Sequence, residues 1–149
     1  MARVLITGMS GTGKSTILLE LARRGHHVLD TDYGGWVLPD GTWNEPRMWD
    51  FLNSEDSVVV SGTVENQGRF FTAFRHVVLL NAPLPVLLQR VQTRLNNPYG
   101  KTEEQKDEIR TYLRDVEPLL RAVATVELDA RLPVTALADA IETLTRDRS

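Results

Sequence analysis

The most constraining feature of this chain is a glycine-rich loop close to its start. The loop reads Gly8-Met9-Ser10-Gly11-Thr12-Gly13-Lys14-Ser15 and matches the pattern G-x-x-x-x-G-K-[ST] in full. Its glycines let backbone N–H groups turn inward around phosphate oxygens, and the helix that follows adds its positive end. In this pattern the lysine neutralises the β- and γ-phosphates, and the next hydroxyl binds Mg²⁺. The loop therefore predicts a site for a nucleoside triphosphate, namely ATP with Mg²⁺.

The contacts expected for such a nucleotide follow residue by residue. We expect the phosphates to be bound by Gly8, Ser10, Gly11, Thr12, Gly13, Lys14, Ser15 and Thr16. The motif also requires a strand before the loop and a helix after it. Residues 4–7 form a short apolar and β-branched run, and residues 15–24 have apolar side chains at helical spacing. The local pattern therefore supplies both flanking elements.

The rest of the chain continues the alternation of short apolar runs and helical patterns. We predict buried strands at residues 4–7, 27–30, 58–60, 76–80 and 126–128. We predict helices at residues 15–24, 45–52, 66–74, 85–95, 102–124 and 133–145. Thr102 and Gln105 indicate a capped start for the long helix, and Pro118 kinks or splits it. This order predicts an α/β protein with the three-layer P-loop NTPase fold and a five-stranded parallel sheet.

Composition limits the class of protein further. A chain of 149 residues is expected to form a single domain, residues 1–149. The net charge of −3 argues against a nucleic-acid partner, because a general nucleic-acid surface needs a basic excess. The chain contains no cysteine, which excludes disulfides and thiolate metal sites. We find no signal peptide and no apolar run long enough for a membrane span, so we expect a cytoplasmic location.

Two classes of P-loop protein fit the sequence poorly. A GTPase would carry an N-K-x-D segment, and the chain has no Asn-Lys pair. A motor or AAA-type ATPase normally needs more chain and an acidic residue after its third strand, where this chain has Ser61 and Gly62. Small kinases remain, in which the acidic residue ends the strand after the P-loop helix.

The segment Leu29-Asp30-Thr31-Asp32 occupies that place. It resembles the D-x-D element of adenylate kinase-like P-loop small-molecule kinases, in the shikimate kinase and gluconate kinase branch. The resemblance implies that Asp30 helps to hold Mg²⁺ together with Ser15. It also implies that Asp32 orients or deprotonates the acceptor hydroxyl, a role that phosphoryl transfer requires of one carboxylate. The alternative is that these aspartates only cap a turn.

A second resemblance involves Arg90 and Arg94, which share one face of the predicted helix 85–95. Adenylate kinase-like enzymes have two such arginines at the entrance to the lid. The resemblance implies that Arg90 stacks on adenine and that Arg94 contacts the transferring phosphate, whereas a solvated helix face is the alternative. It also implies a short lid at about residues 96–106 and an adenine wall formed by the loop 129–133, with Pro133 as just the first residue of a helix as the alternative. Lys101 and Arg110 are weaker candidates for phosphate contacts.

The resemblance to these kinases covers the whole chain in the order of its helices and strands. The chain also resembles uncharacterised ATP-binding proteins of the AAA type.

The chain departs from the shikimate kinase pattern in two places, and both concern the acceptor. Shikimate kinases carry three glycines after the third strand, where this chain has Ser61-Gly62-Thr63, and only Arg47 lies where shikimate-binding arginines are expected. Shikimate is therefore a poor candidate for the acceptor. Four side chains after the third strand either line the acceptor site or perform turn chemistry: Ser61, Thr63, Asn66 and Arg69.

The tryptophans are the most unusual part of the composition. All three, Trp36, Trp43 and Trp49, lie between Asp32 and Ser57. They form either an aromatic acceptor pocket or a hydrophobic cap over the sheet, and the sequence leaves both open.

The favoured function is transfer of the γ-phosphate of ATP to a hydroxyl of a small molecule. Lys14, Asp32 and Arg94 are the expected catalytic residues, with Ser15 and Asp30 as metal ligands. One alternative is a nucleoside monophosphate kinase, which would need more arginines around its acceptor. Another is a regulatory ATP-binding protein with slow hydrolysis. The chain is expected to act as a monomer or homodimer.

Overall fold

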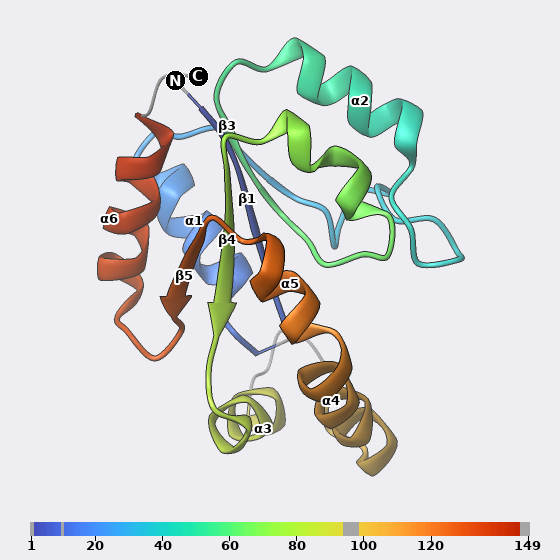
Figure 1. Ribbon diagram of the computed structural model, residues 1–149. Helices are drawn as coiled ribbons and strands as arrows, with labels where there is room; N and C mark the ends of the chain where they lie inside the picture. The colour runs from blue at the N-terminus through green and yellow to red at the C-terminus, as the bar shows by residue number, and fades with distance from the viewer. Residues whose placement is uncertain (1, 10, 94–98, 147–149) are drawn as a thin grey trace.

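A five-stranded sheet forms the centre of the molecule (Figure 1). The computed structural model describes residues 2–9, 11–93 and 99–146. The strands are β1 (Arg3–Gly8), β2 (Val28–Asp30), β3 (Val58–Ser61), β4 (His76–Asn81) and β5 (Val126–Asp129). Their order in the sheet is β2-β3-β1-β4-β5, and every neighbouring pair is parallel. The predicted five-stranded parallel sheet is confirmed.

The central strand β1 is buried on both faces, as its uninterrupted apolar sequence requires. Val4 and Ile6 pack against buried residues of α1 (Lys14–Arg23) and α6 (Val134–Thr145). Leu5 points to the opposite face, because successive side chains of a strand alternate. On that face the core includes buried residues of α2 (Glu45–Ser54). The sheet therefore lies between two helical layers, which confirms the three-layer α/β fold.

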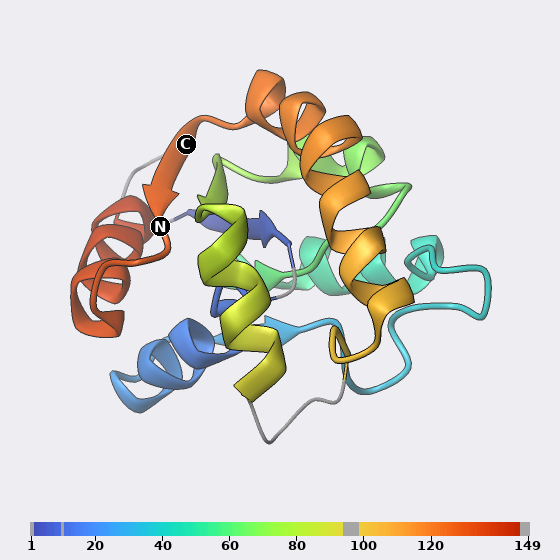
Figure 2. The same cartoon turned by 90° about the horizontal axis from the view of Figure 1, so that it is seen from below.

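The carboxyl ends of the strands share one edge of the sheet. In Figure 1 the arrows of β4 and β5 point toward this edge, where α3 (Leu84–Thr93) and α4 (Glu103–Asp115) lie. Figure 2 looks onto the edge and shows α3 crossing in front of the sheet. In open α/β sheets ligands bind outside the carboxyl ends of the strands. The fold therefore places the glycine-rich loop where a ligand is expected.

The predicted helix 102–124 is two helices, as Pro118 allowed. Thr102 caps α4, since its side chain accepts from the Gln105 N–H and the Gln105 side chain reaches back, which confirms the capping box. The chain then breaks at Val116, and α5 (Glu117–Val123) starts with Pro118 in its first turn. A proline is tolerated there because the first N–H groups of a helix have no partner within it.

The predicted helix 66–74 is a 3₁₀ helix, η1 (Gln67–Ala73). Side chains at its start bind backbone N–H groups outside the helix. The Gln67 side-chain oxygen accepts from the Val64 N–H at 2.8 Å, and the Asn66 side-chain oxygen accepts from the Trp43 N–H at 2.9 Å. These bonds favour tight i to i+3 turns, such as Arg69 N–H to Asn66 C=O at 3.2 Å.

The tryptophans form the hydrophobic cap that was one of the two expectations. Trp43 is fully buried and packs edge-on against Phe70, with ring centroids 5.5 Å apart. Trp49 stacks on the same Phe70 at 4.6 Å. Trp36 is partly buried against the same cluster. The rings therefore fill the core between α2, η1 and the sheet, and they explain why a region with so little secondary structure is ordered.

Gly62 is required by this packing, and we predict that Gly62→Ala is destabilising. A Cβ added at Gly62 would lie 2.8 Å from the Trp43 ring and would clash with the Thr31 hydroxyl, which donates to Ser61 C=O at 2.7 Å. We expect the free energy of unfolding to fall by about 1–3 kcal/mol or more, as for other overpacked cores. Denaturant titration measures this loss. Gly68→Ala is the matched control, because an added Cβ there meets no atom nearer than 4.0 Å. Equal stability of the two variants would contradict this packing.

Candidate nucleotide-binding site

The glycine-rich loop connects the end of β1 to the start of α1. Gly13 caps the helix with φ of 93°, and Gly11 has φ of 95°, a region that side chains other than glycine rarely adopt. A Cβ at Gly11 would also lie 3.0 Å from the Val91 side chain of α3. The first turn of α1 contains no acidic residue. The helix start therefore directs its first N–H groups and its positive end toward an anion in the loop.

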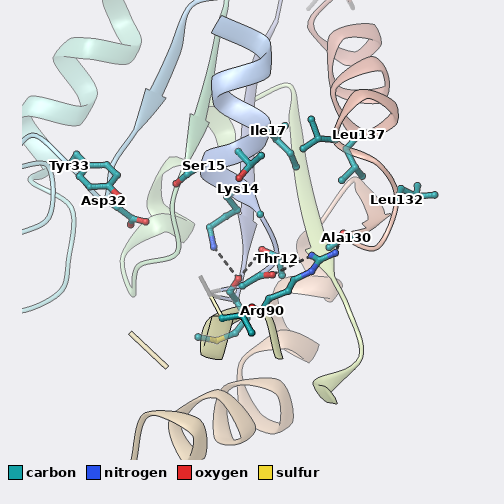
Figure 3. Close-up of a pocket in the computed structure, with 16 residues that line it drawn as sticks. Thr12, Lys14, Ser15, Ile17, Asp32, Tyr33, Arg90, Ala130, Leu132 and Leu137 are labelled. Atoms are coloured by element: carbon teal, nitrogen blue, oxygen red, sulfur yellow. Dashed lines mark hydrogen bonds between the residues drawn. The ribbon is translucent and has the colours of Figure 1, made fainter. Parts of the chain in front are cut away.

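Lys14 is the first residue of α1, and its ammonium group turns back over the loop. It donates to the Gly8 C=O and lies 3.4 Å from the Met9 C=O. Figure 3 shows the Lys14 side chain turned toward the loop. Both carbonyls belong to the loop that the motif assigns to phosphate. The lysine side chain therefore lies at the site itself and not in solvent.

Ser15 and Asp30 form the second polar pair of the site. The Ser15 hydroxyl donates to the Asp30 carboxylate at 2.6 Å, which joins the start of α1 to the end of β2. The other Asp30 oxygen accepts the Asp32 N–H at 3.1 Å and fixes the turn after β2. Hydroxyl and carboxylate oxygens suit Mg²⁺, which is usually held by one or two protein groups together with substrate phosphates. Within the described residues no cluster of three or more His, Cys, Asp or Glu forms a richer metal site.

A cavity of about 440 Å³ lies over the loop. Seven residues of the predicted set line it: Gly11, Thr12, Gly13, Lys14, Ser15, Thr16 and Arg90. Asp32 also lines the cavity, and Figure 3 shows its carboxylate on the side of Lys14 and Ser15. The structure therefore brings together the loop, the second aspartate of the D-x-D segment and the first arginine of α3. Ser10 and Arg94 lie outside the described residues.

Arg90 connects two walls of the cavity. Its guanidinium group donates to the Gly11 C=O at 3.3 Å and to the Ala130 C=O at 2.8 Å. Gly11 belongs to the phosphate loop, and Ala130 belongs to the loop after β5. The planar guanidinium is thus held across the cavity mouth by two backbone carbonyls.

Another wall of the cavity is apolar, and only its loop, residues 129–133, was assigned to a wall from the sequence. Beside Ala130, it is formed by Ile17, Leu132, Val134 and Leu137. Ile17 and Leu137 had the helical spacing of ordinary core residues, so periodicity alone could not assign them to a cavity. Tyr33, Met9 and Thr93 were also missed.

The loop after β5 is stiffened by an ion pair. Arg131 donates to the Asp129 carboxylate through its side chain at 2.8 Å and through its backbone N–H at 2.9 Å. The side-chain bond, supported by the backbone bond, lowers the pKa of Asp129 to about 2. Pro133 caps α6 and lies between two lining residues, Leu132 and Val134.

The polar residues after β3 are committed to internal bonds. Ser61 is buried, and its C=O accepts from the Thr31 hydroxyl. The Asn66 amide accepts from the Trp43 N–H and donates to the Trp43 C=O at 3.0 Å, which fastens the tryptophan loop to η1. Arg69 is exposed and pairs with Glu45 at 3.4 Å. Internal bonds therefore occupy the side chains of Asn66 and Arg69, whereas Ser61 is a buried residue of β3 whose backbone C=O is bonded.

The sequence is similar to known nucleotide-binding proteins and kinases. A family model described as an AAA domain matches residues 4–111. A shikimate kinase of Aromatoleum aromaticum is 29% identical over 147 residues, covering 85% of this chain and 83% of the relative. A shikimate kinase of Halorhodospira halophila is 28% identical over 148 residues, covering 86% and 84%.

Solved structures share the fold. The shikimate kinase from Acinetobacter baumannii in complex with shikimate superposes with a TM-score of 0.70 at 24% identity, covering 97% of this chain and 92% of that one. A gluconokinase from Sinorhizobium meliloti gives a TM-score of 0.64 at 19% identity, covering 96% and 93%. The resemblance to the shikimate and gluconate kinase branch is confirmed.

No helix within the described ranges is long and apolar enough to cross a membrane.

The match to an AAA domain bears on an expectation from the sequence. The short chain and the missing acidic residue after Val60 had argued against an AAA-type ATPase, and the family match runs against that argument. It agrees with the resemblance to an AAA-type ATP-binding protein. By the match to residues 4–111, the chain belongs to this AAA domain family and has the fold of its small-molecule kinase relatives.

Proposed function

We propose that this protein moves the γ-phosphate of ATP to a hydroxyl group of a small molecule. The observation that carries the proposal is the Ser15–Asp30 bond of 2.6 Å, with Lys14 and Asp32 lining the adjoining cavity. Phosphoryl transfer requires positioning, charge neutralisation and a carboxylate near the nucleophile, and these four residues supply all three. The likeness to shikimate kinases and a gluconokinase, which act on hydroxyl compounds, supports the same class of reaction.

The phosphates of ATP would lie along the loop from Gly8 to Thr16, where backbone N–H groups meet the positive end of α1. Lys14 would leave the Gly8 C=O and pair with the β- and γ-phosphates. Ser15 and Asp30 would hold Mg²⁺, the aspartate acting through water. When bound, Mg²⁺ supplies charge neutralisation on the phosphate oxygens.

Asp32 is the proposed acceptor-side carboxylate. Its backbone N–H is fixed by Asp30, and its side chain borders the cavity near Lys14 (Figure 3). A carboxylate there would orient the acceptor hydroxyl and take up its proton as the hydroxyl oxygen bonds to the γ-phosphorus, while the bond from that phosphorus to the β-phosphate oxygen breaks and ADP leaves. Arg94 is proposed to contact the transferring phosphate, and a lid at about residues 96–106 is proposed to exclude water.

The adenine ring would lie between Arg90 and the apolar wall. A guanidinium group held flat by two carbonyls suits stacking on a base, and Leu132 and Leu137 offer an apolar surface across from it. Pro133 shapes this wall by capping α6. We also propose that the protein works in the cytoplasm as a monomer or homodimer, without nucleic acid.

We predict that Arg90→Met weakens ATP binding by about tenfold, because it removes a charged group while keeping an apolar stem. Titration calorimetry with ATP measures the change. Arg23→Met is the control, since Arg23 is exposed on α1 and its side chain pairs with Glu20, away from the cavity lining. An unchanged dissociation constant in Arg90→Met would contradict the adenine assignment.

A nucleoside monophosphate kinase remains the second candidate of the same class. Its acceptor is a phosphate, which needs several arginines. Between Asp32 and Ser57 the only arginine is Arg47, whose guanidinium lies 3.9 Å over the Trp36 ring and donates to the Gly34 C=O at 2.8 Å. This engagement favours a hydroxyl acceptor.

ATP turnover with and without a panel of acceptors tests the function. The panel contains sugars, sugar acids, cyclic polyols and nucleoside monophosphates. We expect one hydroxyl compound to stimulate ADP formation. Stimulation by a nucleoside monophosphate alone would favour the second candidate. Turnover that no compound changes would favour a slow regulatory ATPase.

A further inference from the structure

The Thr63 hydroxyl lies at the root of the phosphate loop. It follows β3, and its oxygen is 2.8 Å from the Gly8 C=O, 3.1 Å from the Gly8 nitrogen and 2.9 Å from the Thr7 hydroxyl. Thr7 is fully buried in β1 and also receives a bond of 3.1 Å from the Gln67 side-chain amide. Three side chains, from β1, η1 and the loop after β3, are therefore linked in series, and the last of them, Thr63, binds both backbone groups of Gly8.

The hydrogens of this cluster can be assigned by counting donors. Gln67 can only donate through its NH₂ group, so the Thr7 oxygen accepts that bond and the Thr7 hydroxyl hydrogen is directed to Thr63. Thr63 has one hydrogen, which the Gly8 C=O accepts. Its two lone pairs accept from the Thr7 hydroxyl and the Gly8 N–H. The bonds form one directed chain, from Gln67 through Thr7 and Thr63 to Gly8.

The buried Tyr112 phenol lies beside Thr63. Its burial raises the pKa of the phenol, and the nearby Thr63 hydroxyl lowers that pKa by a smaller amount. The Thr63 oxygen itself makes three bonds, to the Gly8 C=O, the Gly8 N–H and the Thr7 hydroxyl.

This series of hydrogen bonds ends at the Gly8 C=O, which also binds Lys14. The Gly8 C=O accepts from both the Thr63 hydroxyl and the Lys14 ammonium. Because Thr63 binds both the N–H and the C=O of Gly8, it fixes the residue from which the loop departs from β1. A loop root fixed in this way keeps the following N–H groups pre-organised for phosphate.

We infer that Thr63 is a positioning residue for ATP binding, which acts through Gly8 and Lys14 and does not touch the nucleotide. The inference rests on the proposed ATP site but not on phosphoryl transfer. It assigns to Thr63 a role in the nucleotide site, in place of the acceptor-lining role that its place after β3 had suggested.

The test compares three variants by titration calorimetry with MgATP and no acceptor. We expect Thr63→Val, which keeps the shape and removes the hydroxyl, to weaken ATP binding by about tenfold. Thr63→Ser keeps the hydroxyl and should bind within about twofold of the wild type, since its bonds are retained. Thr7→Val removes the donor into Thr63 and the acceptor of the Gln67 amide, but both bonds from Thr63 to Gly8 remain, so the loss of ATP binding should stay below about threefold.

Thermal unfolding and amide exchange separate positioning from stability. Thr7 is the more buried of the two threonines, so Thr7→Val should lose at least as much stability as Thr63→Val while binding ATP better. Exchange of the Gly8 amide should accelerate in Thr63→Val and not in Thr7→Val. If Thr63→Val does not fold, Thr63→Ala takes its place with the same expected loss.

Two results would overturn the inference. One is ATP binding in Thr63→Val within twofold of the wild type. The other is a loss of binding that follows the loss of stability across all variants, with Thr63→Ser no better than Thr63→Val. A protein that binds ATP with the expected order of affinities but phosphorylates nothing would contradict the proposed kinase activity and leave this inference standing.

Discussion

Asp32→Asn is expected to lower the rate of phosphoryl transfer by about 10²–10⁴-fold, the range typical for loss of a general base. The asparagine side chain has nearly the same shape as aspartate and still accepts a hydrogen bond, but it cannot take up the proton of the acceptor hydroxyl. ATP binding should change little, because Ser15 and Asp30 hold their bond without the Asp32 side chain. Single-turnover transfer and ATP titration calorimetry together measure this separation.

Asp40→Asn is the matched control for this prediction. Asp40 lies in the same segment after β2, and it accepts bonds from the Thr42 backbone N–H at 3.0 Å and from the Thr42 hydroxyl. The bond from the Thr42 hydroxyl, supported by the bond from the Thr42 N–H, lowers the pKa of Asp40. This carboxylate therefore has a structural role in its turn. The Asp40 variant should transfer phosphate at the wild-type rate. Wild-type transfer by Asp32→Asn as well would show that the base lies elsewhere.

Lys14→Met is the second variant with a large expected effect. Removing the ammonium group leaves the charge that develops on the γ-phosphate without its protein cation, and we expect transfer to fall by about 10²–10³-fold. ATP binding should weaken too, since the same group pairs with the ground-state phosphates. Steady-state kinetics with the acceptor measures both changes.

Lys14→Arg sharpens the Lys14 test. It keeps the positive charge, but its planar guanidinium is larger than the ammonium group that fits beside the Gly8 and Met9 carbonyls. We therefore expect this variant to recover only part of the lost activity. Full activity in Lys14→Met would contradict the role of the loop, whatever the acceptor is.

The strands were predictable because parallel sheets leave a strong signal. Val58, Val59 and Val60 are all buried, so the third strand is apolar at every position and not at alternate ones. The 3₁₀ helix η1 was predicted as a regular helix because hydrophobic spacing does not reveal bonds such as Gln67 to Val64. Local side-chain bonds to the backbone decided its geometry.

The site was predictable where chemistry uses a fixed spacing. The loop pattern located Lys14 and Ser15, and the position of Asp30 at the end of β2 brings it within 2.6 Å of the Ser15 hydroxyl. The helical part of the apolar wall was not predictable, because Ile17 and Leu137 have the spacing of core residues whether or not they also border a cavity. The role of Thr63 was hidden for a similar reason. Its partners Thr7 and Gly8 lie far from Thr63 in the sequence, and the pairing of β1 with β3 brings them close to it.

The fate of the γ-phosphate tests the central claim most directly. ATP labelled on its γ-phosphate is incubated with the protein and with pools of small hydroxyl compounds, and the products are separated. We predict that with one pool the label appears on a small organic molecule in an amount equal to the ADP formed, and that Asp32→Asn does not produce it. Label that appears only as inorganic phosphate, at a rate that no pool changes, would contradict the claim that this protein is a small-molecule kinase.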